Sequence, residues 1–172
     1  MEQFPRALKP LPDKVTGISA EIISQAAAVS RKSPRRRVIF PFHKSNKDTL
    51  HRMLNVIQPG SYTQPHRHMN PPKAEAIIVI RGSGAGIIFD EKGEISDVFF
   101  LSTNSNFIGV DLEPGVFHTF LALEEDTVLF EAKQGPYDRT TDKDFAVWAP
   151  SETSGSASAY MNQLYDHIQA RV

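Results

Sequence analysis

The chain has 172 residues, of which 40% are hydrophobic and 23% are charged, and its net charge is −1. These values indicate one ordinary globular domain, and they exclude wholesale disorder and a global attraction to nucleic acid or anionic membranes. The chain contains no cysteine, which excludes disulfides, iron–sulfur clusters and thiolate zinc sites. The N-terminal residues carry proline and charge instead of the apolar stretch of a signal peptide, and the longest strongly apolar run, 76–80, is far shorter than the ~20 residues of a membrane span. We therefore expect a cytoplasmic protein that does not enter a membrane.

Residues 1–37 are expected to form an arm followed by a helix. Three prolines in the first 12 residues favour an extended arm. Ser19 is a suitable N-cap, and apolar residues recur at helical spacing after it, so the pattern predicts a helix over residues 19–31. Pro34 is the latest point at which this helix can end.

Residues 38–150 have the pattern of an antiparallel β-sandwich or β-barrel. Short runs rich in Val, Ile and Phe are separated by turn residues every 8 to 12 positions or so, with no helical pattern between them. The segment 90–93 (DEKG) between two apolar runs predicts a hairpin. The expected strands are 38–42, 52–58, 61–68, 76–81, 85–90, 95–101, 107–111, 116–123 and 127–132.

Residues 151–172 begin with a small polar linker and end in a predicted amphipathic helix. The apolar positions of this helix are Ala157, Tyr160, Met161, Leu164, Tyr165 and Ile168. Its apolar face can pack on the barrel of its own chain or on a second subunit, so a homodimer is one of the two alternatives.

A histidine pair provides the strongest functional signal. His66 and His68 are two residues apart, so on a strand their side chains point to the same face, as two ligands of one metal must. Tyr62 and Gln64 share that parity and are expected to line the same surface. Glu75 opens the next apolar strand, where an unpaired buried carboxylate is costly unless a cation lies beside it.

A third histidine completes the set of candidate metal ligands. His118 enters an otherwise apolar strand just after the Pro114–Gly115 turn. Three imidazoles and a carboxylate leave one or two positions open on an octahedral metal. Nitrogen and oxygen ligands suit Fe, Mn, Ni, Co or Zn, and the sequence does not select one of these divalent metals.

The order of these residues resembles the two motifs of the cupin family. The first motif corresponds to Gly60, His66, His68, Glu75 and Gly82, with a longer interval than usual between His68 and Glu75. The second motif is matched loosely by Gly109, Pro114, Gly115 and His118, and Ala122 stands where an asparagine is usual. The resemblance implies a mainly β fold: a single double-stranded β-helix, a jelly-roll-like antiparallel barrel, with a short N-terminal helix and a C-terminal helix.

One subgroup of the cupins resembles this sequence more closely than the family motifs alone. The strings PHRH (65–68), FEAKQGPY (130–137) and DKDFAVWAP (142–150) resemble those of WbuC-type cupin metalloproteins, over roughly residues 20–152. Genes for that subgroup lie among bacterial genes for surface-polysaccharide biosynthesis. The resemblance implies a metal near one end of the barrel, but it does not supply a reaction.

Several polar residues are candidates for acid–base catalysis or substrate binding beside the metal. Lys73 in the long turn and Tyr62 are the candidate acid–base groups. The candidate substrate-binding residues are Gln64, Arg52, Arg35, Arg36 and Tyr137, with the basic segment 31–37 either a solvated face or a clamp for a phosphate.

Three functions remain open from the sequence. The first is a metal-dependent enzyme of the isomerase or epimerase type that acts on a sugar or nucleotide-sugar in surface-polysaccharide biosynthesis. The second is an Fe(II)-dependent dioxygenase. The third is a non-catalytic module that binds a small molecule or has a regulatory role. None of them involves nucleic acid or a membrane.

Overall fold

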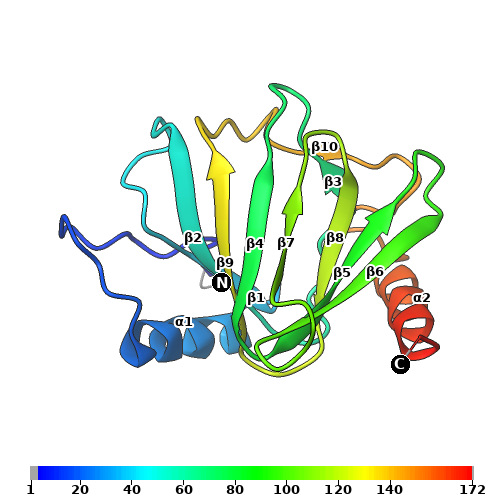
Figure 1. Cartoon of the computed structure of the whole chain (residues 1–172), viewed down its shortest axis with the longest axis horizontal. Helices are drawn as coiled ribbons and strands as arrows, with labels where there is room; N and C mark the ends of the chain where they lie inside the picture. The colour runs from blue at the N-terminus through cyan, green and yellow to red at the C-terminus, as the bar shows by residue number, and fades with distance from the viewer. Residues whose placement is uncertain (1–3, 172) are drawn as a thin grey trace.

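The computed structural model of the protein describes residues 4–171, which form two β-sheets and two helices (Figure 1). In chain order the elements are α1 (Ala20–Lys32), β1 (Arg37–Pro41), β2 (Leu50–Ile57), β3 (His66–Arg67), β4 (Glu75–Arg81), β5 (Ser83–Phe89), β6 (Ile95–Ser102), β7 (Gly109–Leu112), β8 (Phe117–Ala122), β9 (Thr127–Gln134), β10 (Asp144–Phe145) and α2 (Ala157–Gln169). Neither helix of this part of the chain is long and apolar enough to cross a membrane.

The two sheets each have five strands, and the named strands pair antiparallel. Their orders are β1-β2-β9-β4-β7 and β10-β3-β8-β5-β6. Except for the pairs β1–β2 and β5–β6, strands adjacent in sequence lie in different sheets, so the chain crosses repeatedly between the two layers. The prediction of a mainly β, antiparallel barrel with one helix near each end is confirmed.

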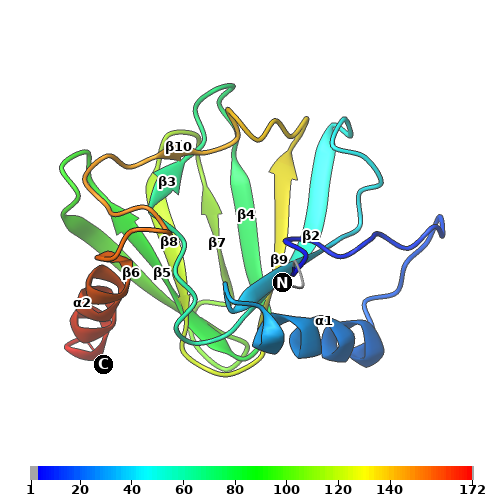
Figure 2. The same cartoon turned by 180° about the vertical axis from the view of Figure 1, so that it is seen from behind.

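Strand alternation creates an interior between the sheets and two covered outer faces. The interior cluster includes Ile57, Ile77, Val79 and Leu129. Helix α1 covers the outer face of β1 and β2, and α2 covers the outer face of β5 and β8. The two helices therefore lie on opposite sides of the molecule (Figure 2).

Both helices occur where the apolar spacing predicts them. Ser19 caps α1, and its Oγ accepts a hydrogen bond from the Ile22 N–H at 3.4 Å. In α2, Leu164 and Ile168 are buried against the barrel of their own chain. The predicted hairpin is present as well, because β5 and β6 pair across residues 90–93.

The predicted strand 61–68 is shorter in the structure, where β3 contains two residues. Pro65 has no N–H to contribute to a ladder. Residues 61–65 instead form an irregular segment, in which the Gln64 amide donates to the carbonyls of Ala146 and Ala149. Strand β10, which pairs with β3, was not predicted, because two residues are too few to show a period.

A buried polar network ties α1 to the turn before β9. The Asp126 carboxylate accepts hydrogen bonds from Arg31 Nε at 2.9 Å and from Gln58 Nε2 at 2.8 Å. Gln58 Nε2 also donates to Ser30 Oγ at 2.7 Å. The hydrogen bonds from Arg31 hold the pKa of the Asp126 carboxyl below its ordinary value.

We expect Asp126→Asn to destabilise the protein near pH 7 and to have a smaller effect near about pH 3. The folded-state pKa of Asp126 is depressed, so its contribution is present above the unfolded value of ~3.9 and is lost as the pH falls through the folded value. Asparagine tolerates the φ of +55° at this position, so the backbone is not newly strained. Urea unfolding at both pH values measures the effect, with Glu125→Gln as the control. An equal loss of stability at both pH values would contradict it.

Candidate metal centre

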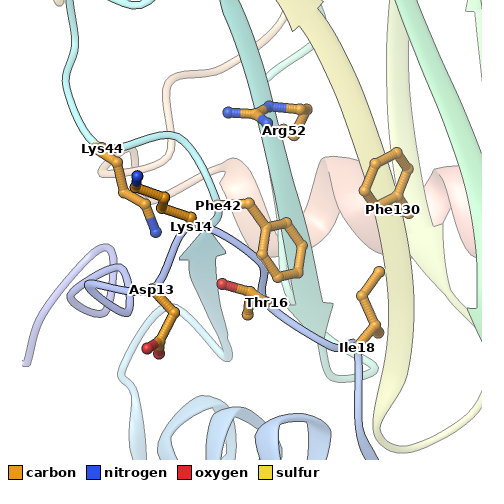
Figure 3. Close-up of a pocket in the computed structure, with 8 residues that line it drawn as sticks. All are labelled: Asp13, Lys14, Thr16, Ile18, Phe42, Lys44, Arg52 and Phe130. Atoms are coloured by element: carbon orange, nitrogen blue, oxygen red, sulfur yellow. The ribbon is translucent and has the colours of Figure 1, made fainter.

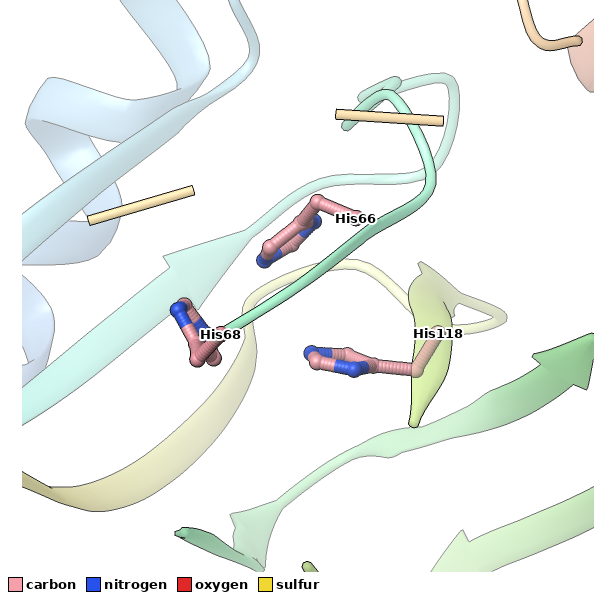
Figure 4. A group of neighbouring side chains, drawn as sticks. All are labelled: His66, His68 and His118. Carbon is pink, nitrogen blue, oxygen red and sulfur yellow. The ribbon is translucent and has the colours of Figure 1, made fainter. Parts of the chain in front are cut away.

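Three histidines meet between the sheets. His66 lies in β3 opposite His118 of β8, and His68 follows directly after β3. The ring centroids of His66 and His118 are 4.6 Å apart, and all three side chains are buried. Their candidate ligand nitrogens lie within 4.8 Å of one another (Figure 4).

Glu75 places a carboxylate against two of the three histidines. It is the first residue of β4, and its side chain points to the interior because it shares parity with buried Ile77. Its Oε2 is 3.0 Å from His118 Nε2 and 3.3 Å from His68 Nε2. Adjacent ligands ~2.1 Å from one metal ion are ~3.0–3.4 Å apart, so these separations fit a shared cation.

The hydrogen bonds of the imidazoles leave Nε2 as the metal-binding nitrogen of each ring. Each Nδ1 contacts a backbone carbonyl oxygen: that of Gln64 for His66 at 3.0 Å, Asp142 for His68, and Val116 for His118 at 2.9 Å. A carbonyl only accepts, so Nδ1 carries the proton in each neutral ring, and Nε2 carries a lone pair.

These lone pairs face the Glu75 carboxylate, which can only accept when ionised. His68 Nε2 and Glu75 Oε2 have no hydrogen-bond partner, although both are buried. A proton or a metal cation must therefore lie among these acceptors, and the donor set fits a divalent metal.

The turn before His118 requires a glycine. Gly115 has a φ of +88°, which lies in the left-handed region that glycine adopts without strain. It follows Pro114 between β7 and β8, and this turn aims His118 inward two residues into the ladder.

A buried layer of charges lies beneath Glu75. Lys133 Nζ is 3.1 Å from Asp142 Oδ2, 3.7 Å from Glu131 Oε1 and 4.0 Å from Glu75 Oε1. Burial and the charge of Glu75 raise the pKa of Glu131 to about 8. Burial alone would lower the pKa of Lys133, but these three acids raise it. Lys133 thus lies within 4.0 Å of all three acids, and Asp142 has a second cation in Lys73.

Lys143 connects the histidines to a polar pocket. Its Nζ contacts Nε2 of His66, and burial together with the charge of Lys133 lowers the pKa of Lys143 to about 8. Burial, followed by the charge of Lys143, lowers the pKa of His66 well below its ordinary value. A pocket of about 280 Å³ adjoins Lys143, and it is lined by Met69, Asn70, Thr140, Thr141, Lys143 and Asp144.

Two other predicted residues lie at the same end of the barrel. Lys73 is buried, and its Nζ donates to the Pro136 carbonyl at 2.6 Å and to Asp142 Oδ1 at 3.3 Å. It therefore supports the segment that contacts His68 and does not line the pocket. Tyr137 is 39% exposed at the rim, where its backbone N–H donates to the Asn46 carbonyl.

Tyr62 and Gln64 do not face the histidines, in contrast to the shared face that strand parity predicts. The Tyr62 hydroxyl donates to the Pro150 carbonyl at 2.8 Å, and its ring packs edge-on against Tyr160 of α2. The amide of Gln64 holds the segment 146–149. Residues 61–65 are not in a strand, so the alternation of side chains does not extend over them.

The candidate arginines also lie away from the histidines. Arg52 is on the outer face of β2, because the inward positions there are those of His51 and Met53. Arg35 and Arg36 precede β1 at the opposite end of the barrel, where Arg35 pairs with Glu152 at 3.3 Å and Arg36 Nε donates to the Pro59 carbonyl. The basic segment is thus occupied by contacts within the chain.

Sequence reasoning missed four charged residues of the site. Glu131 and Lys133 alternate with Leu129 on the inner face of β9, so their parity on an apolar strand could have revealed them. Asp142 and Lys143 lie in an irregular segment before β10, and no period identifies them.

Comparisons with known proteins agree with this fold. A family model described as a domain of unknown function (DUF6016) matches residues 18–101, and no curated protein matches the sequence. A structure described as CapF with the inhibitor 3-isopropenyl-tropolone matches at 21% identity over 66% of this chain, with a TM-score of 0.53.

Two further structures have TM-scores below 0.5. CapF from Staphylococcus aureus, described as a capsular polysaccharide assembling protein, matches at 0.48 with 22% identity over 58% of this chain. A variant of oxalate decarboxylase from Bacillus subtilis matches at 0.46 with 23% identity over 58%. This chain spans 32% of the inhibitor-bound CapF chain, 27% of the Staphylococcus aureus CapF chain and 24% of the oxalate decarboxylase chain.

The fold and the site together define the class of protein. The chain has the cupin fold, and it carries between its sheets a buried three-histidine cluster that can hold a metal ion.

Proposed function

We propose that this protein is a metal-dependent enzyme of the isomerase or epimerase type, which acts on a sugar or nucleotide-sugar in bacterial surface-polysaccharide biosynthesis. The observation that carries the proposal is the buried cluster of His66, His68 and His118, with the Glu75 carboxylate against Nε2 of two of the three rings. One divalent metal ion, drawn from Fe, Mn, Ni, Co and Zn, is the proposed cofactor.

The residues around the site have distinct roles in this proposal. A divalent metal supplies Lewis acidity, which polarises a carbonyl or a pair of hydroxyls. The three histidines and Glu75 hold the ion, and their Nδ1 hydrogen bonds orient the rings. Lys143 Nζ contacts Nε2 of His66, and if that nitrogen held the ion, the Lys143 ammonium would be available to an anionic or hydroxyl group of the substrate.

The pocket supports a small polar substrate. Its lining is Met69 together with amide, hydroxyl and charged side chains, which match sugar hydroxyls better than an apolar ligand. The polysaccharide context rests on the resemblance to WbuC-type cupins. Tyr62 is turned away and Lys73 is held by Asp142, so neither is retained as the acid–base group.

The test combines metal loading with a solvent-exchange assay. Protein stripped with a chelator is reloaded separately with each of the five metals and incubated in D₂O with a panel of sugar phosphates and nucleotide-sugars. NMR detects deuterium incorporation at the carbon whose proton moves. We expect turnover with at least one metal, and a loss of at least about tenfold in Lys143→Met, because a hydrogen bond to a charged group contributes ~1.5–3 kcal/mol.

The exposed Lys92→Met variant is the matched control and is expected to retain activity. Failure to bind any of the five metals would overturn the proposal. Oxygen uptake by the iron-loaded protein, without deuterium exchange, would favour the dioxygenase instead. Metal binding without turnover on any member of the panel would favour the binding module.

A further inference from the structure

A second pocket lies on the outer face of the first sheet, away from the histidines (Figure 3). Arg52 of β2 and Phe130 of β9 line it, whereas the next residues along these strands, Met53 and Glu131, point into the barrel. The pocket has a volume of about 310 Å³, and the N-terminal arm forms one wall with Asp13, Lys14, Thr16 and Ile18.

The pocket has an excess of positive charge. Lys14, Lys44 and Arg52 line it against one acid, Asp13. Within residues 4–171 none of these four side chains forms an ion pair; Lys44 Nζ donates to the neutral carbonyl of Leu11. The Nε of Arg52 is buried and has no hydrogen-bond partner. A buried guanidinium N–H without an acceptor is costly, and an oxyanion would satisfy it.

Aromatic rings lie beside the cations. Phe42 and Phe130 are half-buried, and their ring centroids are 6.3 Å apart at an interplanar angle of 33°. Ile18 of the arm lies below Phe130 in the view of Figure 3. The pocket therefore combines an apolar floor with a cationic rim, as sites for small organic anions do.

We propose that this pocket binds a small organic anion, with a phosphate or carboxylate head group held by Arg52, Lys14 and Lys44 and an apolar body on Phe42 and Phe130. The volume limits the ligand to about the size of one substituted ring. The site is on the far face of the sheet from Glu75, so its ligand binds without the metal and is a different molecule from the substrate. Binding would tie the arm to the sheet.

Isothermal titration calorimetry on chelator-treated protein tests the proposal with four probes: phenyl phosphate, benzoate, inorganic phosphate and benzyl alcohol. We expect phenyl phosphate or benzoate to bind at least about tenfold more tightly than both of the other probes. Whichever of phenyl phosphate and benzoate binds more tightly identifies the head group as a phosphate or a carboxylate. We also expect the bound probe to slow amide hydrogen exchange in residues 13–18, because these residues form a wall of the pocket.

Variants locate the binding. Arg52→Gln is expected to weaken the affinity at least about tenfold, because the hydrogen bonds to the anion lose their charge. The double variant Lys14→Gln, Lys44→Gln changes only exposed side chains and keeps the test valid if Arg52→Gln fails to fold. Lys47→Gln, an exposed lysine outside the pocket, is the matched control. The proposal is overturned if no probe binds, if benzyl alcohol binds as well as the anions, or if the affinity is unchanged in the Arg52 and double-lysine variants.

Discussion

Replacing His118 with alanine is expected to lower the affinity for a divalent metal by more than about 100-fold. Changing a residue that only supports a metal ligand costs 10–100-fold in affinity, and loss of a ligand itself costs more. His118 Nε2 also lies 3.0 Å from Glu75 Oε2, so the substitution removes a candidate ligand that is in direct contact with another one. Elemental analysis of protein purified without chelator, followed by competition with a chelating dye, measures the change.

The matched control is His167→Ala, because His167 lies in α2 and outside the cluster. It is expected to retain the metal content of the wild type. Circular dichroism of both variants after chelator treatment separates loss of metal from loss of fold. Wild-type protein that binds none of the five metals, or a His118→Ala variant with undiminished affinity, would rule out the ligand assignment.

The second large effect concerns the charges beneath the site. Lys133→Met is expected to lower the free energy of unfolding of the metal-free protein by about 3–5 kcal/mol, because breaking a buried ion pair leaves carboxylates without their cation. The Lys133 side chain is 6% exposed and lies within 4.0 Å of oxygens of Asp142, Glu131 and Glu75. Urea unfolding in the presence of a chelator measures the loss.

A compensating variant tests the reason for this loss. Glu131→Gln removes an acid whose ion pair within residues 4–171 is with Lys133 alone, at 3.7 Å, so adding it to Lys133→Met is expected to restore part of the stability. Lys92→Met, at an exposed position, is expected to change the stability by less than about 0.5 kcal/mol. A loss in Lys133→Met no larger than in this control would show that the buried charges do not depend on Lys133.

Local patterns in the sequence identified most of the architecture. The helix after Ser19, the hairpin at 90–93 and the C-terminal helix follow from caps, turn residues and apolar spacing, which act within a few residues. The proximity of His66 and His68 is also local, because two positions apart is enough to place them side by side. Glu75 and His118 are candidates because each is a polar residue in an otherwise apolar strand segment.

Long-range packing decided what surrounds those residues. Lys143 reaches His66 across 77 positions of sequence, and Lys133 meets Asp142 across a turn that has no periodic pattern. Arg52 is on the outer face because the pairing of β2 with β9 sets which residues point inward. A sequence pattern reports a residue's local neighbours, whereas the environment of a buried charge depends on strands that meet only in the folded chain. The sequence alone therefore determined the elements and the candidate ligands, and the tertiary structure determined the charged layer, the pocket and the second pocket on the outer face.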